Sequence, residues 1–377
     1  RHRGHFYNWY DTLTLKPLHP RYISSVDSGN LAGHLLTLRV ALLDLPEQKI
    51  LHPRLFAGLL TTLDILADAI AVLNAVSNST TAATTQSALQ QLRAQLTAAC
   101  TQPPANLAAV VQQLAPMTRS AGELAASLAP DTDARIWADD LQQQCHSALE
   151  ELRFLAPWLS LPAAPASLSL FANDTDIPNL RELIKRNAAQ LAAIDARLQS
   201  TMSAAPLSAD ETTWLSALHE LTQTGTEHAT RRIAHAEQLA QQAFGFAAME
   251  YEFLYDNTRH LLAIGYNVDD LRRDTSFYDL LASEARLCSF VAIAQGQLPQ
   301  ESWFALGRLL TSVGGEPVLV SWSGSMFEYL MPMLVMPTYD NTLLHQTMLT
   351  AVDCQIRSGR QRGVPWGMSE SGYNATD

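Results

Sequence analysis

The sequence has few of the cations that a nucleic-acid-binding protein needs. Its 377 residues include 25 Lys and Arg against 37 Asp and Glu, which gives a formal net charge of −12, and the cations are scattered without a basic run. Binding to a phosphate backbone requires clustered cations that replace its counterions. The charge pattern therefore argues against nucleic acid and is compatible with a neutral substrate.

Cysteine is also scarce. Cys100, Cys145, Cys288 and Cys354 lie 45 or more residues apart, and neither a CxxC motif nor a Cys/His pair at metal-ligand spacing occurs. Zinc sites and disulfide frameworks depend on such spacings. We therefore interpret the cysteines as reduced core thiols in a cytosolic setting, and we expect no metal and no cofactor.

Long hydrophobic runs are missing as well. No apolar run of about 18 residues and no signal peptide is present. The chain begins Arg1-His2-Arg3-Gly4, so we expect a piece cut from a longer polypeptide, with no membrane segment in this piece. A hydrophobic content of 47% with 16% charged residues indicates a globular chain with a large core, and we expect the piece to be soluble.

Composition divides the chain into three predicted regions: 1–76, 77–248 and 249–377. In the first, a stretch rich in His, aromatics and Pro precedes a helix start at Asp27–Asn30, and helices are expected over roughly Leu31–Leu43 and Arg54–Val76. The middle region is rich in Ala and Gln and predicts a run of amphipathic helices. Its expected breaks are Gln102–Pro104, Ala129–Asp131, Leu161–Pro165 and Ala205-Pro206.

The third region mixes short strands with helices. Apolar and aromatic runs around Asp256–Arg259 predict a small β-hairpin near 250–266. Apolar spacing predicts a helix over Ser276–Gln295. The further expected elements are a short helix at Glu301–Leu310, a strand at Val318–Ser321, a helix beginning after Ser325 and a helix over Asn341–Arg357.

The last stretch, Pro365–Asp377, has one acid, Glu370, between Trp366 and Tyr373. Its glycines allow a loop, and a carboxylate between two aromatic rings suits a sugar site. The other interpretation is a solvated loop whose glutamate caps something local.

Glu284 and Glu328 also have two interpretations each. Glu284 is spaced to lie near the buried stripe of its helix, where it would need a partner such as Arg286 or Arg308 unless it faces a cavity. Glu328 follows Ser325 by three residues, the spacing of a capping box. Trp322 could serve as a sugar platform or as core, and Asp27 and Asn30 as helix caps, as cavity wall or as both.

Six segments together resemble a known family. They are GHFYNWYDT, SSVDSGNLAGHLL, IGYNVDD, YDLLASEARL, SWSGSMFEYLMP and GVPWGMSESGYN. In this order they are similar to the central, glucoamylase-like region of bacterial cyclic β-1,2-glucan synthases. The resemblance implies a mainly α-helical (α/α) toroid, related to β-1,2-glucanases, that closes linear β-1,2-glucan into rings by transglycosylation. The family's barrel continues beyond the SES block, so we expect a toroid that is incomplete at its C-terminus.

The resemblance also implies the site residues. Glu284 and Glu370 would be the catalytic acids, with Glu370 as nucleophile and Glu284 as acid/base. A retaining mechanism would place the two carboxyls about 5–5.5 Å apart. The residues expected to line the groove are Asn8, Trp9, Tyr10, Asp11, Asp27, Asn30, Asp269, Trp322, Ser323, Glu328, Trp366 and Tyr373.

The implied partners are the β-1,2-glucan chain and two neighbouring parts of the same polypeptide, a membrane-embedded glucosyltransferase and a phosphorylase-like part. The implied location is the cytoplasmic face of the bacterial inner membrane. Two alternatives stay open: a β-1,2-glucan hydrolase, and a non-catalytic helical module that binds glucan and guides it between its neighbours.

Overall fold

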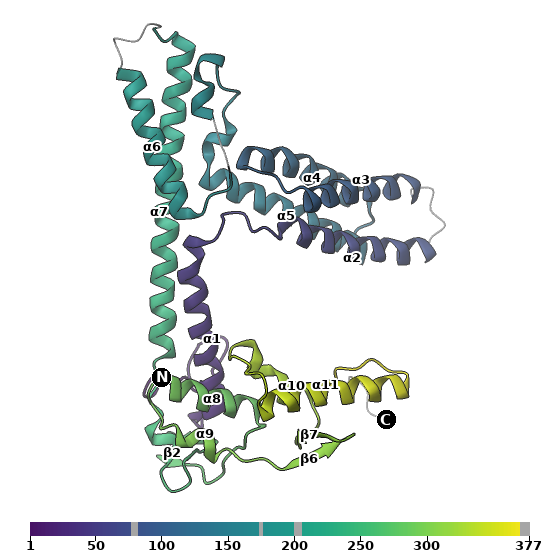
Figure 1. Cartoon of the computed structure of the whole chain (residues 1–377), viewed down its shortest axis with the longest axis vertical. Helices are drawn as coiled ribbons and strands as arrows, with labels where there is room; N and C mark the ends of the chain where they lie inside the picture. The colour runs from purple at the N-terminus through teal and green to yellow at the C-terminus, as the bar shows by residue number, and fades with distance from the viewer. Residues whose placement is uncertain (77–81, 173–175, 200–205, 370–377) are drawn as a thin grey trace. The chain divides into compact units, whose positions relative to one another are not determined.

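The computed structural model describes residues 1–76, 82–172, 176–199 and 206–369 (Figure 1). The chain divides into two compact units: a discontinuous unit, formed by residues 1–42 and 238–377, and an inserted unit, formed by residues 43–237. Helices predominate in both, which confirms the mainly α-helical class. The division into 1–76, 77–248 and 249–377 stays a prediction.

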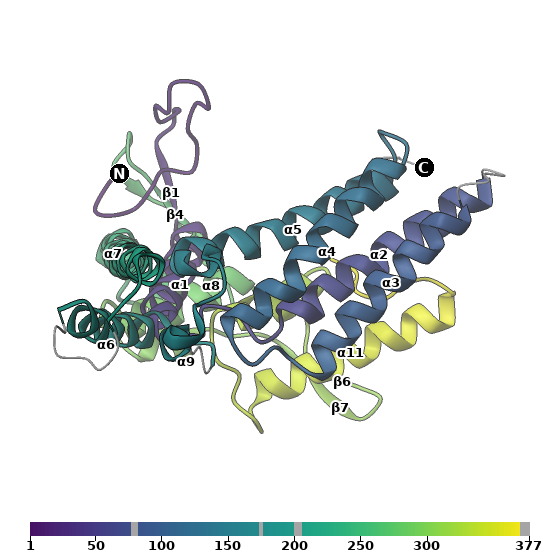
Figure 2. The ribbon, with the colours of Figure 1, turned by 90° about the horizontal axis from the view of Figure 1, so that it is seen from above.

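Four helices of the inserted unit lie side by side in both ribbon views (Figures 1 and 2). They are α2 (Leu55–Val76), α3 (Ala82–Thr101), α4 (Leu107–Ser127) and α5 (Asp133–Leu155). The proline-containing breaks expected near 103 and 130 separate α3, α4 and α5. Asn106 caps α4 by accepting from the Ala109 N–H at 2.9 Å, and Thr132 caps α5 in the same way.

The core of this bundle follows from the helical period. On α2, Leu59, Leu63, Leu66 and Ile70 recur every three or four residues and are buried against α3 and α5. Within the described residues, α2 over Leu55–Asn74 is long and apolar enough to cross a membrane by length and composition. The core helix of a bundle passes the same test.

The inserted unit continues with α6 (Leu180–Gln199) and most of α7 (Ala209–Ala247), whose last residues belong to the discontinuous unit. Short 3-10 turns occur at η1 (Leu45–Glu47), η2 (Pro157–Ser160), η3 (Ala166–Ala172), η4 (Glu252–Leu254) and η5 (Met331–Leu334). The helical character predicted for the Ala- and Gln-rich region is confirmed.

The strands of the discontinuous unit are short. β1 (Tyr22–Ser24), β4 (Gly265–Asn267) and β5 (Arg272–Arg273) form an antiparallel sheet with β4 in the middle. β2 (Tyr255–Asp256) pairs with β3 (Leu261–Leu262), which confirms the predicted hairpin. Residues 265–267 were expected to extend that hairpin but pair with β1 instead. This pairing connects the two parts of the discontinuous unit, residues 1–42 and 238–377.

Helix α1 (Ser25–Asp44) corrects two expectations. It begins at Ser25, six residues before Leu31, and its cap is Ser24, whose Oγ accepts from the Asp27 N–H at 3.2 Å. The helical spacing of the leucines from Leu31 onward favours a leucine face, but the buried residues are the small ones: Ser25, Ser28, Gly29, Ala32 and Gly33. Leu31 and Leu38 are exposed.

The small residues allow α1 to pack closely on α8 (Ser283–Ala294). A Cβ placed on Gly29 would lie 2.2 Å from the Cβ and 2.3 Å from the Cα of Cys288. Real side chains do not approach that closely, so only glycine permits this contact. Cys288 and Cys145 are buried as predicted, whereas Cys100 is exposed and is not a core thiol.

The remaining elements are α9 (Glu301–Ala305), β6 (Leu310–Val313), β7 (Glu316–Leu319), α10 (Met326–Leu330) and α11 (Leu343–Arg362). The helix expected over Ser276–Gln295 starts only at Ser283, because Phe277 pairs with Ala263 and the Asp279 side chain closes a turn on Leu281 and Ala282. The helix expected over 301–310 ends at Ala305, and Leu310 begins a hairpin that turns at Gly314 and Gly315, both with positive φ.

Candidate functional site

The loop before β1 is fastened to the first turn of α1 through Asn8. The Asn8 Nδ2 donates to Asp27 Oδ2 at 3.0 Å, and its Oδ1 accepts from the Ser24 N–H, also at 3.0 Å. Asp27 is exposed and lies in the first turn, where the helix dipole favours a negative charge. Two residues predicted for the site are therefore in direct contact.

Asn30 lies one turn further along α1. Its Oδ1 is buried and has no hydrogen-bond partner among the residues that the structure describes. A buried acceptor without a donor costs roughly 1–3 kcal/mol. A hydroxyl group of a ligand is one donor that would satisfy it.

The sequence did not single out Tyr22, Tyr278 and Asp274, but both tyrosines lie within electrostatic reach of Asp27 and of Asp274. Tyr22 Oη donates to Asp274 Oδ2, and burial together with this bond raises the pKa of Tyr22. Burial, and after it the negative charges of Glu284, Asp27 and Asp274, raises the pKa of Tyr278. Three carboxylates from separate elements thus act on one phenol.

Glu284 lies in the first turn of α8 and is half-buried. The expected salt bridge with Arg286 or Arg308 is not formed. Arg286 donates to the carbonyls of Leu280, Glu328 and Tyr329, and burial lowers its pKa to about 10. By binding the last carbonyls of α10, Arg286 fixes α10 against α8.

Arg308 pairs instead with Asp279, at 2.6 Å. Asp279 Oδ2 also accepts from the Trp322 Nε1–H at 2.9 Å, so the indole is attached to the turn that precedes α8. Trp322 is 69% exposed and is therefore not a core residue. The core interpretation of Trp322 is therefore wrong, and its role as a sugar platform stays a prediction.

Glu328 is buried and accepts from the Ser323 N–H at 3.4 Å. Ser325 caps α10 by accepting from the Phe327 N–H at 3.1 Å, as predicted. A capping box would require Glu328 to accept from the N–H of Ser325, the N-cap residue. Glu328 accepts instead from the N–H of Ser323, two residues earlier. Its local structural role stands, and Ser323 itself is exposed at the turn.

The segment that leads to Glu370 is held beside α10 and α11. Gln355 Oε1 accepts from the N–H groups of Gly367 and Met368, at 3.0 and 2.8 Å, and the Met326 N–H donates to the Met368 carbonyl at 2.8 Å. Trp366 is exposed in this segment. Glu370 and Tyr373 lie outside the described residues, so the predicted distance between the two catalytic carboxyls stays a prediction.

The other N-terminal residues of the predicted groove have local partners. Trp9 is 49% exposed and stacks on Tyr22 with ring centroids 6.1 Å apart. The Tyr10 hydroxyl accepts from the Tyr7 N–H. Asp11 closes a turn by accepting from Thr14, and these bonds lower its pKa.

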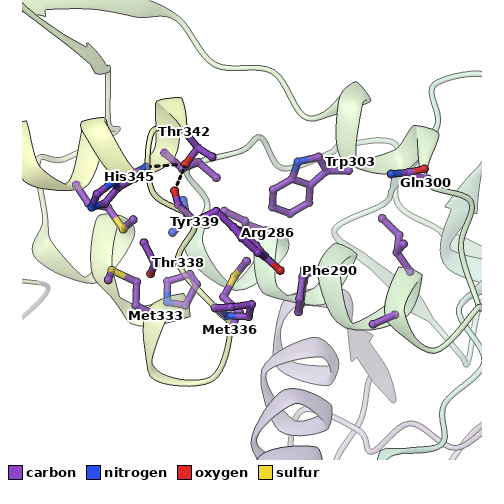
Figure 3. Close-up of a pocket in the computed structure, with 16 residues that line it drawn as sticks. Arg286, Phe290, Gln300, Trp303, Met333, Met336, Thr338, Tyr339, Thr342 and His345 are labelled. Carbon is purple, nitrogen blue, oxygen red and sulfur yellow. Dashed lines mark hydrogen bonds between the residues drawn. The ribbon is translucent and has the colours of Figure 1, made fainter.

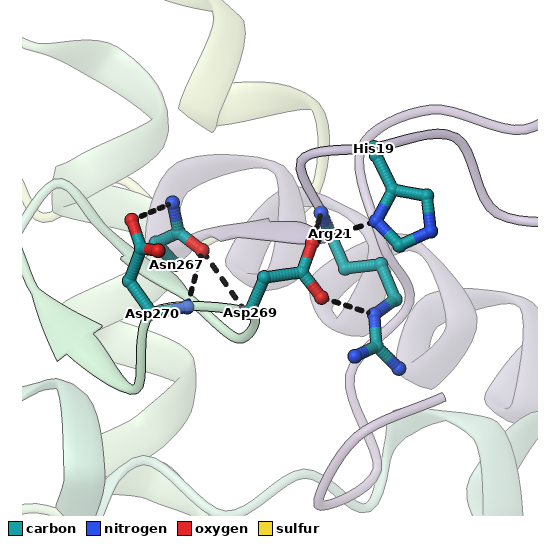
Figure 4. A network of polar contacts seen from close by, with 5 residues as sticks. All are labelled: His19, Arg21, Asn267, Asp269 and Asp270. Carbon is teal, nitrogen blue, oxygen red and sulfur yellow. Dashed lines mark hydrogen bonds and ion pairs between the residues drawn. The ribbon is translucent and has the colours of Figure 1, made fainter.

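Asp269 joins the strand entering α1 to the loop after β4 (Figure 4). Its Oδ2 accepts from the Arg21 N–H and lies 2.8 Å from His19 Nδ1, and its Oδ1 accepts from Arg21 Nε at 2.6 Å. The backbone bond from Arg21, followed by the side-chain bonds, holds the pKa of Asp269 well below its usual range. The structure thus gives Asp269 a fastening role, and its binding role stays a prediction.

A pocket of about 390 Å³ lies between α8, α9, η5 and α11 (Figure 3). Its wall is mainly apolar and aromatic, with Phe290, Trp303, Met333 and Met336, and Figure 3 shows Trp303 and Met333 on opposite sides. None of the predicted site residues with described positions lines it. Asp27 and Asn30 lie near the start of α1, Glu284 in the first turn of α8 and Glu328 in the first turn of α10.

Within the part of the chain that the structure describes, no group of three or more His, Cys, Asp or Glu could hold a metal ion. The described side chains among the predicted site residues offer carboxyl, amide, phenol, hydroxyl and indole groups.

No family model matches the chain. A curated relative shows that the chain is homologous to a segment of a cyclic glucan synthase. This relative is the cyclic beta-(1,2)-glucan synthase NdvB of Rhizobium meliloti (strain 1021). The two sequences are 34% identical over 379 residues, which cover 100% of this chain and 11% of that protein's length. The predicted family resemblance is thereby confirmed.

Proposed function

We propose that this chain is the ring-closing segment of a cyclic β-1,2-glucan synthase. In this proposal it transfers an anomeric carbon within a linear β-1,2-glucan to the hydroxyl at the far end of the same chain by intramolecular transglycosylation, which closes a ring and releases the fragment beyond the broken bond. The observation that carries the proposal is the relationship of the whole chain to such a synthase. It is supported by the exposed Trp322, whose indole N–H is bound to Asp279 in the turn that precedes the helix carrying Glu284.

The reaction needs two carboxyl groups on either side of a glycosidic bond. Glu284, as the acid, donates its proton to the oxygen of the bond that breaks. The Glu370 carboxylate attacks the anomeric carbon, the fragment that carries the protonated oxygen leaves as an alcohol, and a glycosyl ester forms. The hydroxyl at the far end of the same chain then attacks that carbon, gives its proton to Glu284 and releases Glu370.

The surrounding residues suit a ligand with many hydroxyl groups and apolar ring faces. The Asn30 Oδ1 is an acceptor without a partner among the described residues, and the exposed Asp27 carboxylate lies three residues before it on α1. Trp322 and Trp366 expose aromatic surface, which covers the apolar face of a pyranose. Such walls also leave little ordered water near the glycosyl ester, which favours transfer over hydrolysis.

The proposal extends to the larger protein. The discontinuous unit would supply part of the inner wall of an (α/α) toroid. The glucan would come from a glucosyltransferase part of the same polypeptide, and a phosphorylase-like part would set its length. The reaction would take place at the cytoplasmic face of the inner membrane.

The test is to incubate linear β-1,2-glucan with the parent chain and with Glu284→Gln and Glu370→Gln, and then to digest the products with an exo-acting β-glucosidase. Rings have no free end and resist digestion. We expect resistant product from the parent and a loss of about 10²–10⁴-fold in rate when the general acid is replaced.

The matched control is Glu301→Gln, which replaces an exposed acid in the first turn of the neighbouring helix α9. It should cyclise at the parent's rate. New reducing ends in place of rings would mean a hydrolase. Glucan binding without turnover, unaffected by Glu284→Gln or Glu370→Gln, would mean a binding module and would overturn the proposal.

A further inference from the structure

Asp279 uses both oxygens of its carboxylate, each for a different element. Oδ1 accepts from the N–H groups of Leu281 and Ala282, at 2.9 and 3.2 Å. Oδ2 accepts from Arg308 at 2.6 Å and from the indole N–H of Trp322 at 2.9 Å. The side chains of Asp279 and Arg308 are only 21% and 18% exposed, so this network is partly shielded from water.

The Trp322 ring is held from two directions. Its N–H is bound to Asp279, and the Arg308 guanidinium lies 5.3 Å from the centre of the ring, a cation–π contact. Arg308 is held in turn by a hydrogen bond to the Val320 carbonyl. The ring nevertheless remains 69% exposed, so a ligand can reach it.

An exposed indole does not need a protein acceptor, because water can accept its N–H. Fixing the ring costs side-chain entropy. Because folding has already fixed the ring, the ring loses no further freedom when a ligand stacks on it, and the entropy lost on binding is smaller. The arrangement is therefore that of a prepared stacking surface.

The other oxygen of Asp279 fixes the start of α8. The Ala282 N–H is bound to Asp279, and the Ala282 carbonyl accepts from the N–H groups of Ala285 and Arg286, at 2.9 and 3.1 Å. Glu284 lies between these residues, in the first turn. A continuous series of hydrogen bonds thus runs from the indole of Trp322 through Asp279 to the backbone that carries Glu284.

We propose that Asp279 is a positioning residue that sets the Trp322 ring, as the platform for one glucose unit of the glucan, at a fixed place relative to Glu284. This inference rests on the proposed function. Neither Asp279 nor Arg308 touches the sugar. Asp279 acts through Trp322 on substrate binding and through the turn before α8 on the proton donor.

The chain contains a matched control for the purely structural role. Asp256 also closes a turn with one oxygen, accepting from Thr258 and Arg259 at 3.0 Å each, and pairs with Arg273 at 2.9 Å through the other. Its side chain is 20% exposed, almost the same as that of Asp279. It binds no indole and does not precede a predicted catalytic residue.

The experiment compares the parent with Asp279→Ala, Asp279→Asn, Trp322→Phe and Asp256→Ala in the same protein that shows ring closure. We expect Asp279→Ala to raise KM about tenfold and to lower kcat by about tenfold or more, since small misplacements near a reacting bond are costly. Trp322→Phe should raise KM with a smaller effect on kcat. Asp279→Asn should recover part of both losses, because its amide oxygen can still accept a hydrogen bond. Asp256→Ala should leave both constants within twofold.

Two further measurements separate the possible failures. The first is fluorine NMR of protein labelled with 5-fluorotryptophan, in which the Trp322 signal is identified by its absence from Trp322→Phe. This signal should shift in Asp279→Ala and stay in place in Asp256→Ala. Calorimetry with linear glucan on the Glu284→Gln background measures binding without turnover. If that protein binds no glucan and the parent closes no rings, the proposed function and this inference both fail. If the parent closes rings and Asp279→Ala matches Asp256→Ala in KM and kcat, this inference alone is overturned.

Discussion

The contact between α1 and α8 leads to a sharp prediction for Gly29→Ala. The added Cβ would lie 2.2 Å from the Cβ of Cys288 and 2.3 Å from its Cα. Favourable carbon–carbon contacts lie at about 3.5–4.0 Å, so the two helices would have to separate by roughly 1.5 Å. The obstacle includes backbone, which cannot turn aside as the end of a flexible side chain can.

Overpacking of this kind costs about 1–3 kcal/mol, and occasionally more. Alanine would recover up to about 1 kcal/mol through its better helix propensity. We therefore expect a net destabilisation of about 1–2 kcal/mol. The same shift would move Glu284, on α8, relative to Asp27, on α1, so ring closure should fall more steeply than stability.

The assay is urea unfolding followed by circular dichroism, combined with the ring-closure test at a urea-free condition where every variant is folded. Two glycines serve as controls. A Cβ on Gly33 would lie 3.3 Å from the flexible end of Leu287, so Gly33→Ala should have a milder effect. A Cβ on Gly245, in α7, would meet nothing within 4 Å, and Gly245→Ala should be neutral or stabilising. If Gly29→Ala were as stable and as active as Gly245→Ala, the close-packing argument would be refuted.

Two further predictions concern stability. His5 is fully buried between Ser28 and the Glu250 carbonyl, and burial lowers its pKa to about 4. The folded protein therefore favours neutral His5. The fold keeps its full stability above pH 6.5 and loses stability as the pH drops toward 4. The shift corresponds to about 3 kcal/mol, and His5→Gln should flatten the dependence of the urea midpoint on pH between 7 and 4; an unchanged slope would contradict the assignment. Asn106→Ala should destabilise the inserted unit by about 1 kcal/mol through loss of the cap of α4, as measured by the urea midpoint, whereas Asn106→Asp should retain most of the stability.

The long helices of the inserted unit could be predicted because their signals are local. Apolar residues at helical spacing predicted α2 to within a residue of its start, and the spacing around Ser325 indicated a cap. The same rules failed for α1, since the buried face of a helix depends on its partner. A single sequence does not reveal that α8 approaches so closely that Gly29, not Leu31 or Leu38, faces the interior.

Errors near the site have a similar cause. The apolar spacing predicted that α8 begins at Ser276. The helix begins later, because the Asp279 side chain and the pairing of Phe277 with Ala263 hold this stretch outside the helix. Such bonds leave no periodic signal in a sequence. The Gly314-Gly315 pair, in contrast, was a readable hairpin signal that the sequence analysis passed over. Tyr22 and Asp274 were missed because only the pairing of β1 with β4 and of β4 with β5 brings them together.

The interrupted course of the discontinuous unit has a consequence for its biosynthesis. Its first 42 residues are separated from the next part of the same unit by residues 43–237, a stretch of 195 residues. Cys288 follows Gly29 by 288 − 29 = 259 residues. Ribosomes add roughly 5–20 residues per second, so about 13–50 s pass before α8 is made and can cover Gly29. The helices of the inserted unit have their own core and can fold during that delay. The N-terminal segment must wait, with the small-residue face of α1 uncovered, for a partner that the ribosome has yet to deliver.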